Sequence, residues 1–263
     1  MLRAFSSAVS GMRSQMAFMD VVANNIANVN TTAFKAARAR FADMLYQTLN
    51  GGSDIINPTQ IGLGMRLSGV DTIMTQGALR TTGNPLDLAV EGDGFFILKD
   101  ANGNTFYTRD GSFIINSNGD LVHAGTGMKV QNDGGSDALT GFDPTQYSSV
   151  SIGPDGKIMA IPAAGGAPTQ IGQIGLATFK NPEGLLHAGD NLWRESASSG
   201  TANQTQPQQN GAGSLRSGVL ESSNVDLAQE FANMIAAQRG FQANSRVITA
   251  SDEILQDLVN IKR

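Results

Sequence analysis

Residues 2–26 read LRAFSSAVSGMRSQMAFMDVVANNI, and their larger apolar side chains recur at alternating steps of three and four residues. This heptad spacing predicts one long helix with a narrow apolar stripe, although Gly11 inside it costs about 1 kcal/mol relative to alanine. The stripe contains Leu2, Phe5, Val9, Met12, Met16, Met19, Ala23 and Ile26. Because a single helix cannot bury such a stripe by itself, we expect it to pack against other helices.

The C-terminal segment from Val225 to about Ile261 repeats this pattern. Asp226 and Glu230 lie near the expected start, where acidic side chains interact favourably with a helix dipole. Ser222, Ser223 and Asn224 are candidate helix caps. The apolar column, with a period of seven residues, contains Leu227, Met234, Phe241, Ile248 and Leu255, and beside it lie Phe231, Ile235, Leu258 and Val259. The sequence therefore predicts a second long helix with its own apolar stripe.

A polar column lies next to this second stripe, at Gln238, Ser245 and Asp252. Such a helix is suited to meet partner helices on one side while its neighbouring flank stays in water. The two helices could pair within one chain, but their outer apolar flanks would then remain uncovered. We therefore expect further subunits to cover them. Methionines such as Met12 and Met234 either fill an ordinary core or adapt to nonidentical partners.

The middle of the chain has short apolar runs in place of a helical period. Asn-Gly and Asp-Gly pairs at 102–103, 110–111, 118–119 and 155–156 favour tight turns, and the runs are rich in β-branched and aromatic residues. The expected strands lie within 86–90, 94–98, 105–108, 112–115, 120–122, 150–152, 157–161, 170–179 and 191–194. This texture predicts an antiparallel β domain.

The chain as a whole is predicted to be α+β, with heptad-patterned terminal helices that form a coiled-coil-like layer and with a central antiparallel all-β domain. Segments 50–62 and 197–213 are rich in small and polar residues, which favours extended connectors. The predicted division is an axial helix over 1–30, a linker and extended connecting region over 31–81, the β domain over 82–200, an extended linker over 201–222 and a second axial helix over 223–263.

Composition excludes several classes of function. The 263 residues include no cysteine, which removes disulfides, thiolate metal sites and cysteine nucleophiles, and His123 and His187 are the two histidines. A net charge of -5 without blocks of like charge argues against nucleic-acid binding. No run approaches the 18 or so apolar residues of a membrane span, and the N-terminus lacks the apolar core of a signal peptide. We expect no nucleic-acid partner, no membrane insertion and no cleaved signal.

Chemical motifs are weak. Residues 100–104 (DANGN) alternate oxygen ligands as a calcium loop does, but Thr105 and Gly111 stand where such a loop needs Gly and Glu, so we expect a hairpin turn. No Gly-Lys-Ser/Thr and no Gly-x-Ser-x-Gly occurs. The sequence predicts no catalytic residue, no cofactor and no metal, and hence no enzyme.

Long motifs at both ends and in the middle resemble the bacterial flagellar rod and hook protein family. They are NNIANVNTTAFK at 24–35, TGNPLDLAVEGDGFF at 82–96, YTRDGSF at 107–113, and ESSNVDLAQEF with MIAAQRGFQANSR at 221–231 and 234–246. Within them the resemblance singles out Asn24, Asn25, Asn28, Phe34, Ser223, Asn224, Val225, Gln238 and Arg239. The length and GNPLD at 83–87 suit a distal-rod subunit, whereas QRGFQANSR at 238–246 and the ending at 252–263 resemble hook proteins, including short ones. Distal rod and hook therefore both stay open, and the implied location is the flagellar basal body or hook. Ala33 departs from the family, which usually has glycine there.

The resemblance implies a helical homopolymer, motility as the context, and a hollow axial tube that transmits torque and carries exported subunits. The terminal helices would line the tube, with Gln238, Ser245 and Asp252 facing the lumen. Implied partners are further copies, neighbouring rod, hook and junction proteins, the flagellar type III export apparatus, a cap protein and a surrounding ring bushing. Phe41 and Leu45 match the Phe-x-x-x-apolar pattern that engages the export gate, and a packing role is the alternative.

A second class of function remains open at this level, a secreted β-domain binding module with oligomerising helical ends. It would predict a discrete oligomer and a ligand cleft.

Overall fold

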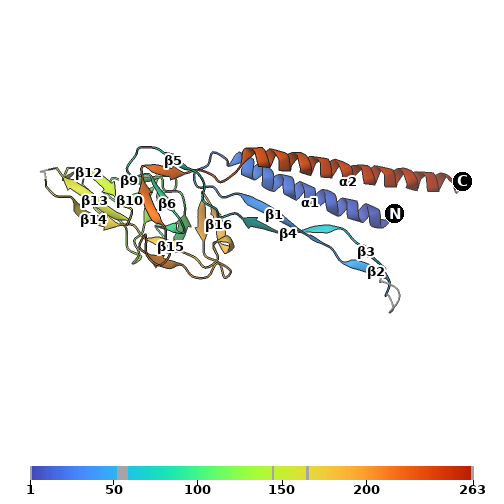
Figure 1. The fold of residues 1–263 in the computed structure, drawn as a ribbon, viewed down its shortest axis with the longest axis horizontal. Helices are drawn as coiled ribbons and strands as arrows, with labels where there is room; N and C mark the ends of the chain where they lie inside the picture. The colour runs from blue at the N-terminus through green and yellow to red at the C-terminus, as the bar shows by residue number, and fades with distance from the viewer. Residues whose placement is uncertain (1, 52–58, 144, 164–165, 262–263) are drawn as a thin grey trace. The chain divides into compact units, whose positions relative to one another are not determined.

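A computed structural model describes residues 2–51, 59–143, 145–163 and 166–261 (Figure 1). The chain forms two compact units. One contains Met1–Val29, Ala36–Ile73 and Val225–Arg263, and the other contains Asn30–Lys35 and Met74–Asn224. The predicted α+β class, with a long helix at each end and antiparallel sheets between them, is confirmed.

The first unit combines two helices with a β-ribbon. Helix α1 spans Leu2–Ala27 and helix α2 spans Leu227–Ile261, close to the predicted segments. The ribbon pairs β1 (Ala37–Asp43) with β4 (Met65–Thr72) and β2 (Tyr46–Asn50) with β3 (Thr59–Gly62), both antiparallel. The described part of 31–81 is therefore largely paired into strands, because the chain doubles back on itself. Part of the connector at 50–62 lies outside the described residues.

The helices of this unit run antiparallel. Gly11 lies against Asn244, Gln15 against Gly240, and Asn25 donates a hydrogen bond to Glu230, so residue numbers fall along α2 as they rise along α1. Figure 1 shows α1 and α2 side by side. Asp226 caps α2, since its carboxylate accepts hydrogen bonds from the backbone N–H groups of Ala228 and Gln229. The cap is therefore later in the chain than the predicted serines and asparagine.

The polar side of α1 faces the ribbon. The Ser10 hydroxyl accepts a hydrogen bond from the Met65 N–H at 3.3 Å, and the Phe18 ring packs edge-on against Phe41 with centroids 6.0 Å apart. Short hydroxyl side chains thus allow the backbone of β4 to approach the helix, which the sequence pattern alone did not indicate.

The second unit is an antiparallel β structure. Its largest sheet follows the order β16-β17-β8-β7-β11-β10-β9, with β15 joining β7 to β18. The strands are β7 (Phe95–Lys99), β8 (Thr105–Thr108), β9 (Phe113–Ile115), β10 (Leu121–His123), β11 (Lys129–Val130), β15 (Leu176–Thr178), β16 (Leu186–Gly189), β17 (Leu192–Arg194) and β18 (Asn203–Thr205). A 3-10 turn, η1, spans Pro182–Gly184 before β16.

Smaller sheets complete this unit. Strands β12 (Tyr147–Ile152), β13 (Lys157–Pro162) and β14 (Thr169–Gln173) form one, β19 (Ser214–Ser217) pairs with β6 (Leu88–Glu91), and β20 (Val219–Glu221) pairs with β5 (Leu79–Thr81). The core centres on apolar side chains such as Phe96, Phe113 and Leu176, with the two phenyl rings edge to face at 5.0 Å.

The edges of the β unit differ from the predicted boundaries. Residues 201–222, expected as an extended linker, supply β18, β19 and β20, because these polar segments find strand partners elsewhere in the unit. Residues 30–35, expected in a linker, also belong to it. The predicted turn at 100–104 is confirmed, since the Gly103 N–H donates to the Asp100 carbonyl at 2.9 Å. This turn joins β7 to β8, which pair antiparallel.

Candidate assembly surface

Several large apolar side chains of both helices remain exposed within one chain. Met16 keeps 46% of its surface exposed and Ile235 keeps 58%, and Phe5, Leu227, Phe231 and Leu255 are exposed as well. Seven further stripe residues are half-buried: Val9, Met12, Met19, Ile26, Met234, Phe241 and Ile248. Ala23 is exposed, and the side chains of Leu2, Leu258 and Val259 lie outside the described part of the structure. Exposed apolar area of this extent marks an interaction surface.

Small side chains between the helices explain this exposure. A Cβ added to Gly11 would lie 2.7 Å from Nδ2 of Asn244, and one added to Gly240 would lie 2.9 Å from Cδ of Gln15. The helices therefore approach through glycine and polar residues, on sides next to the predicted stripes. Because that contact buries few large side chains, the apolar stripes stay available to other molecules.

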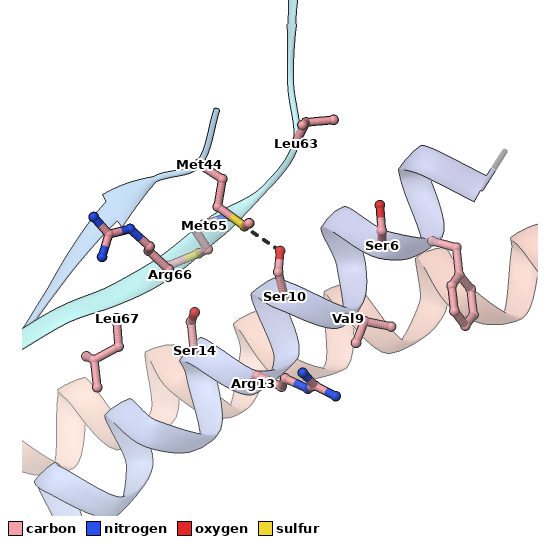
Figure 2. A pocket seen from close by; sticks show the side chains of 11 residues that line it. Ser6, Val9, Ser10, Arg13, Ser14, Met44, Leu63, Met65, Arg66 and Leu67 are labelled. Carbon is pink, nitrogen blue, oxygen red and sulfur yellow. Dashed lines mark hydrogen bonds between the residues drawn. The ribbon is translucent and has the colours of Figure 1, made fainter. Parts of the chain in front are cut away.

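A groove lies between α1 and the ribbon, with a volume of about 710 Å³. Figure 2 shows Ser10 and Ser14 on α1 directed toward Met44, Met65 and Leu67 of the ribbon region, whereas Val9 and Arg13, which also line the groove, project from the other side of α1. Its lining is mainly apolar, and it includes two arginines, Arg13 on α1 and Arg66 on β4. An apolar groove with two cations suits an amphipathic segment that carries acidic residues.

A buried ion cluster occupies the second unit. Lys35 Nζ lies 2.6 Å from Glu221 Oε1, and Arg109 Nη1 lies 3.7 Å from Glu221 Oε2. Lys35 also donates to the Thr75 carbonyl at 2.9 Å, and the Gly77 N–H donates to Glu221 at 2.8 Å. The Arg109 guanidinium stands over the Phe95 ring at 5.2 Å. Burial lowers the pKa of Lys35, and the Glu221 carboxylate opposes that shift.

This cluster joins three motifs that are distant in sequence. Lys35 ends the first motif, Arg109 lies in the middle one and Glu221 begins the last. Sequence reasoning missed it, since pairing over this distance has no local pattern. The motifs of Arg109 and Glu221 contain other charged residues, such as Asp110 and Asp226, so their charges alone did not mark the cluster.

Several motif residues stabilise the first unit. Buried Asn25 bonds with both its side-chain groups to the Ala37 backbone, at 2.8 and 2.9 Å, and so ties α1 to β1. Asn28 donates to Asn24 at 2.7 Å in the last turn of α1. Arg239 bonds to Gln242 on α2 at 3.4 Å.

The motif residues of the second unit lie near the ion cluster. Asn224 donates to the Thr75 carbonyl at 3.1 Å, and its N–H bonds to the Phe34 carbonyl. Ser223 and Phe34 are half-buried there, whereas Val225, also half-buried, belongs to the first unit. These contacts make the motif residues structural, and none of them converges on a chemical site.

The export-gate and lumen candidates are placed as follows. Phe41 is half-buried against Phe18, whereas Leu45 is 81% exposed, so the pair does not form one cluster. Gln238 and Asp252 are exposed and Ser245 is half-buried on α2, with the period of seven residues that keeps them on one side.

A metal site and a membrane-spanning helix are both absent from the described residues. There, no three potential metal-ligating side chains come together, and no helix is both long and apolar enough to cross a membrane.

Three family profiles match the chain. The flagella basal body rod protein profile matches residues 5–35, the flagellar hook protein FlgE/F/G D1 domain profile matches 89–160, and the flagellar basal body rod FlgEFG protein C-terminal profile matches 216–261. These positions follow the order of the motifs found in the sequence.

Relatives aligned over the whole chain are more similar when they are rod proteins than when they are hook proteins. The flagellar basal-body rod protein FlgG of Bacillus subtilis is 50% identical over 272 aligned residues, with 100% of both chains covered. The same protein of Borreliella burgdorferi is 39% identical over 272 residues, again covering 100% of both. The flagellar hook protein FlgE of Borreliella burgdorferi is 28% identical over 442 aligned residues, with both chains fully covered.

Proposed function

Because the chain belongs to the flagellar basal-body rod protein FlgG family, we propose that it polymerises helically with copies of itself into a hollow axial tube. The chain is a structural axial subunit of the distal rod in the basal body, and it is not an enzyme. Family membership also implies assembly with other flagellar axial proteins. The higher identity to rod than to hook proteins answers the question that the motifs left open.

The exposed apolar stripes of α1 and α2 are the observation that carries the polymer proposal. Each stripe continues along its helix, and within one chain its described large apolar side chains are exposed or only half-buried. A contact between different surfaces of successive copies does not close on itself, so it generates a helical filament. Such a filament would transmit torque along its axis, and each buried square ångström of apolar surface would contribute roughly 25 cal/mol.

Electron microscopy of the purified full-length chain, nucleated on isolated basal bodies, tests this proposal. Met16→Glu and Phe231→Glu each place a charge in a stripe and should abolish tubes. Gln242→Glu adds the same charge to an exposed polar position of α2 and should leave tubes intact. Equal assembly of all three variants would contradict the proposal.

The lumen is proposed to be lined by Gln238, Ser245 and Asp252. A polar column lets unfolded chains slide past without the apolar contacts that would retain them. Gln238→Leu and Ser245→Leu should slow the export of subunits added later, while the tubes still form. Unchanged export would assign the column another role.

Export of the subunit is proposed to use the flagellar type III apparatus, whose gate would bind Phe41 and Leu45. Phe41→Ala should lower secretion, but it also removes the ring contact with Phe18. Phe18→Ala removes the same contact and leaves the motif intact, so it is the matched control. Equal secretion of these two variants would favour packing as the role of Phe41. The cap protein and the ring bushing remain proposed partners.

A further inference from the structure

A segment of another copy of this chain is a candidate occupant of the groove between α1 and the ribbon. We propose that the C-terminal end of α2 from a second copy, residues 253–261, inserts into this groove. We call this segment the overhang. The inference rests on the proposed polymerisation and names which parts of two copies meet.

Helix α1 does not run alongside most of the overhang, and the described overhang side chains are exposed. In the antiparallel register set by Gly11 with Asn244 and Gln15 with Gly240, residues near 251 lie opposite the first turn of α1. Residues after 253 extend past the first residue of α1, Leu2. Accordingly, Ile254 is 51% exposed and Leu255 is 41% exposed.

The chemistry of the overhang complements that of the groove. Ile254 and Leu255 offer apolar side chains to a lining of Val9, Leu63 and Leu67. Glu253 and Asp257, one turn apart on a helix, form an acidic edge next to Ile254.

Two cations at the groove can meet that edge. Arg13 and Arg66 are both exposed and lie on α1 and β4 (Figure 2). Apolar anchors set beside opposite charges fix the position of a docked helix, because a shifted helix would leave the charges unpaired.

The overhang cannot fill the groove of its own chain. The residue of α2 opposite Val9 lies near position 246 in the register, and Ile254 is about 12 Å further along the helix axis at 1.5 Å per residue. A straight helix carries Ile254 away from the groove, so a second copy must supply the segment.

Cysteine cross-linking tests the contact directly, because the natural chain contains no cysteine. A full-length chain carrying Leu67→Cys and Ile254→Cys should form a ladder of disulfide-linked oligomers after mild oxidation of its tubes. A disulfide requires Cα atoms roughly 4.4–6.8 Å apart, so cross-linking reports a specific contact. Mixing the two single variants should produce dimers alone, since each chain then has one reactive partner.

Control cysteine pairs distinguish the proposed groove contact from other contacts between copies. Ile61 is exposed on β3 but outside the groove, so Ile61→Cys with Ile254→Cys should not cross-link. Tubes that form with no more cross-linking of the groove pair than of this control would overturn the inference and leave the proposed function intact. A ladder from Leu67→Cys with Phe231→Cys would assign the groove to another segment and also overturn it. Failure of the unaltered chain to form tubes on any template would remove both proposals.

A charge exchange provides a second measurement. Arg66→Asp and Asp257→Arg should each raise the concentration needed for assembly about tenfold, and the double variant should restore it. No recovery in the double variant, with both single variants folded, would contradict the pairing of these charges.

Discussion

Lys35 and Glu221 form an ion pair with an Nζ to Oε1 distance of 2.6 Å, and their side chains are only 1% and 0% exposed. They lie where the chain enters and leaves the β unit, 186 residues apart. Such a pair is costly to desolvate, but removing one partner leaves an uncompensated charge in the interior. The pair therefore specifies how the two ends of this unit meet.

Replacing Glu221 by glutamine should lower the free energy of unfolding of the β unit by about 3–5 kcal/mol. The substitution leaves the Lys35 ammonium and the Arg109 guanidinium buried without their anion. Urea unfolding followed by fluorescence reports this, because Trp193 is the single tryptophan and is buried in the same unit.

Lys157→Gln is the control for this measurement. It breaks a pair with Asp155 in which both side chains are partly exposed, and it should cost less than about 1 kcal/mol. Equal losses for Lys157→Gln and Glu221→Gln would contradict a special role for the buried pair.

Replacing Ala33 by glycine should stabilise the β unit. Ala33 is buried with a φ of 56°, in the left-handed region where a Cβ is strained, and its N–H bonds to the Glu221 carbonyl at 2.8 Å. Glycine removes the strain of roughly 1–2 kcal/mol but loses more chain entropy, so a net gain of about 0.5–1 kcal/mol is expected. Thermal unfolding of both chains measures it, and a lower melting temperature for the glycine variant would refute the prediction.

Replacing Gly11 by leucine should separate α1 from α2. The added side chain would collide with Asn244, and such overpacking costs about 1–3 kcal/mol. Hydrogen exchange of α1 and α2 peptides should show faster exchange than in the natural chain. Ala23→Leu adds the same side chain at an exposed position of α1 and should leave exchange unchanged.

The stability of the β unit should fall in acid partly through Asp110. Burial raises the pKa of its carboxyl, but the contact with His123 and the hydrogen bonds from Ser112 outweigh burial, so the pKa lies below its ordinary value of 3.8. A lowered carboxyl pKa contributes stability that is complete above pH 3.8 and is lost as the pH falls below it.

Asp110→Asn should therefore make stability less dependent on pH from just above pH 3.8 downward. Urea unfolding at several pH values measures the slope. Ser112→Ala removes the hydroxyl donor to Asp110 and should reduce the slope partially. Identical slopes in the natural chain and the asparagine variant would show that Asp110 does not carry the effect.

Local patterns were sufficient to predict the two helices and many strands of the second unit. The heptad spacing predicted α1 within a residue or two, and the turn pairs with β-branched runs predicted strands such as β8 at 105–108. Such features depend on neighbours a few residues apart, so they can be read without the fold. The motifs at 24–35 and 221–246 likewise indicate the family through the order of their residues alone.

Only the tertiary structure decided which surfaces meet. The heptad pattern identified the apolar stripe of α1 but not the neighbouring side, with Gly11 and Gln15, through which α2 packs. Residues 201–222 looked like a linker because strand pairing there depends on distant partners. The contact of Lys35 with Glu221 also depends on residues distant in sequence, because its free energy is set by burial within the whole β unit. Sequence periodicity records what one element can bury, whereas the partner is set by the packing of all elements together.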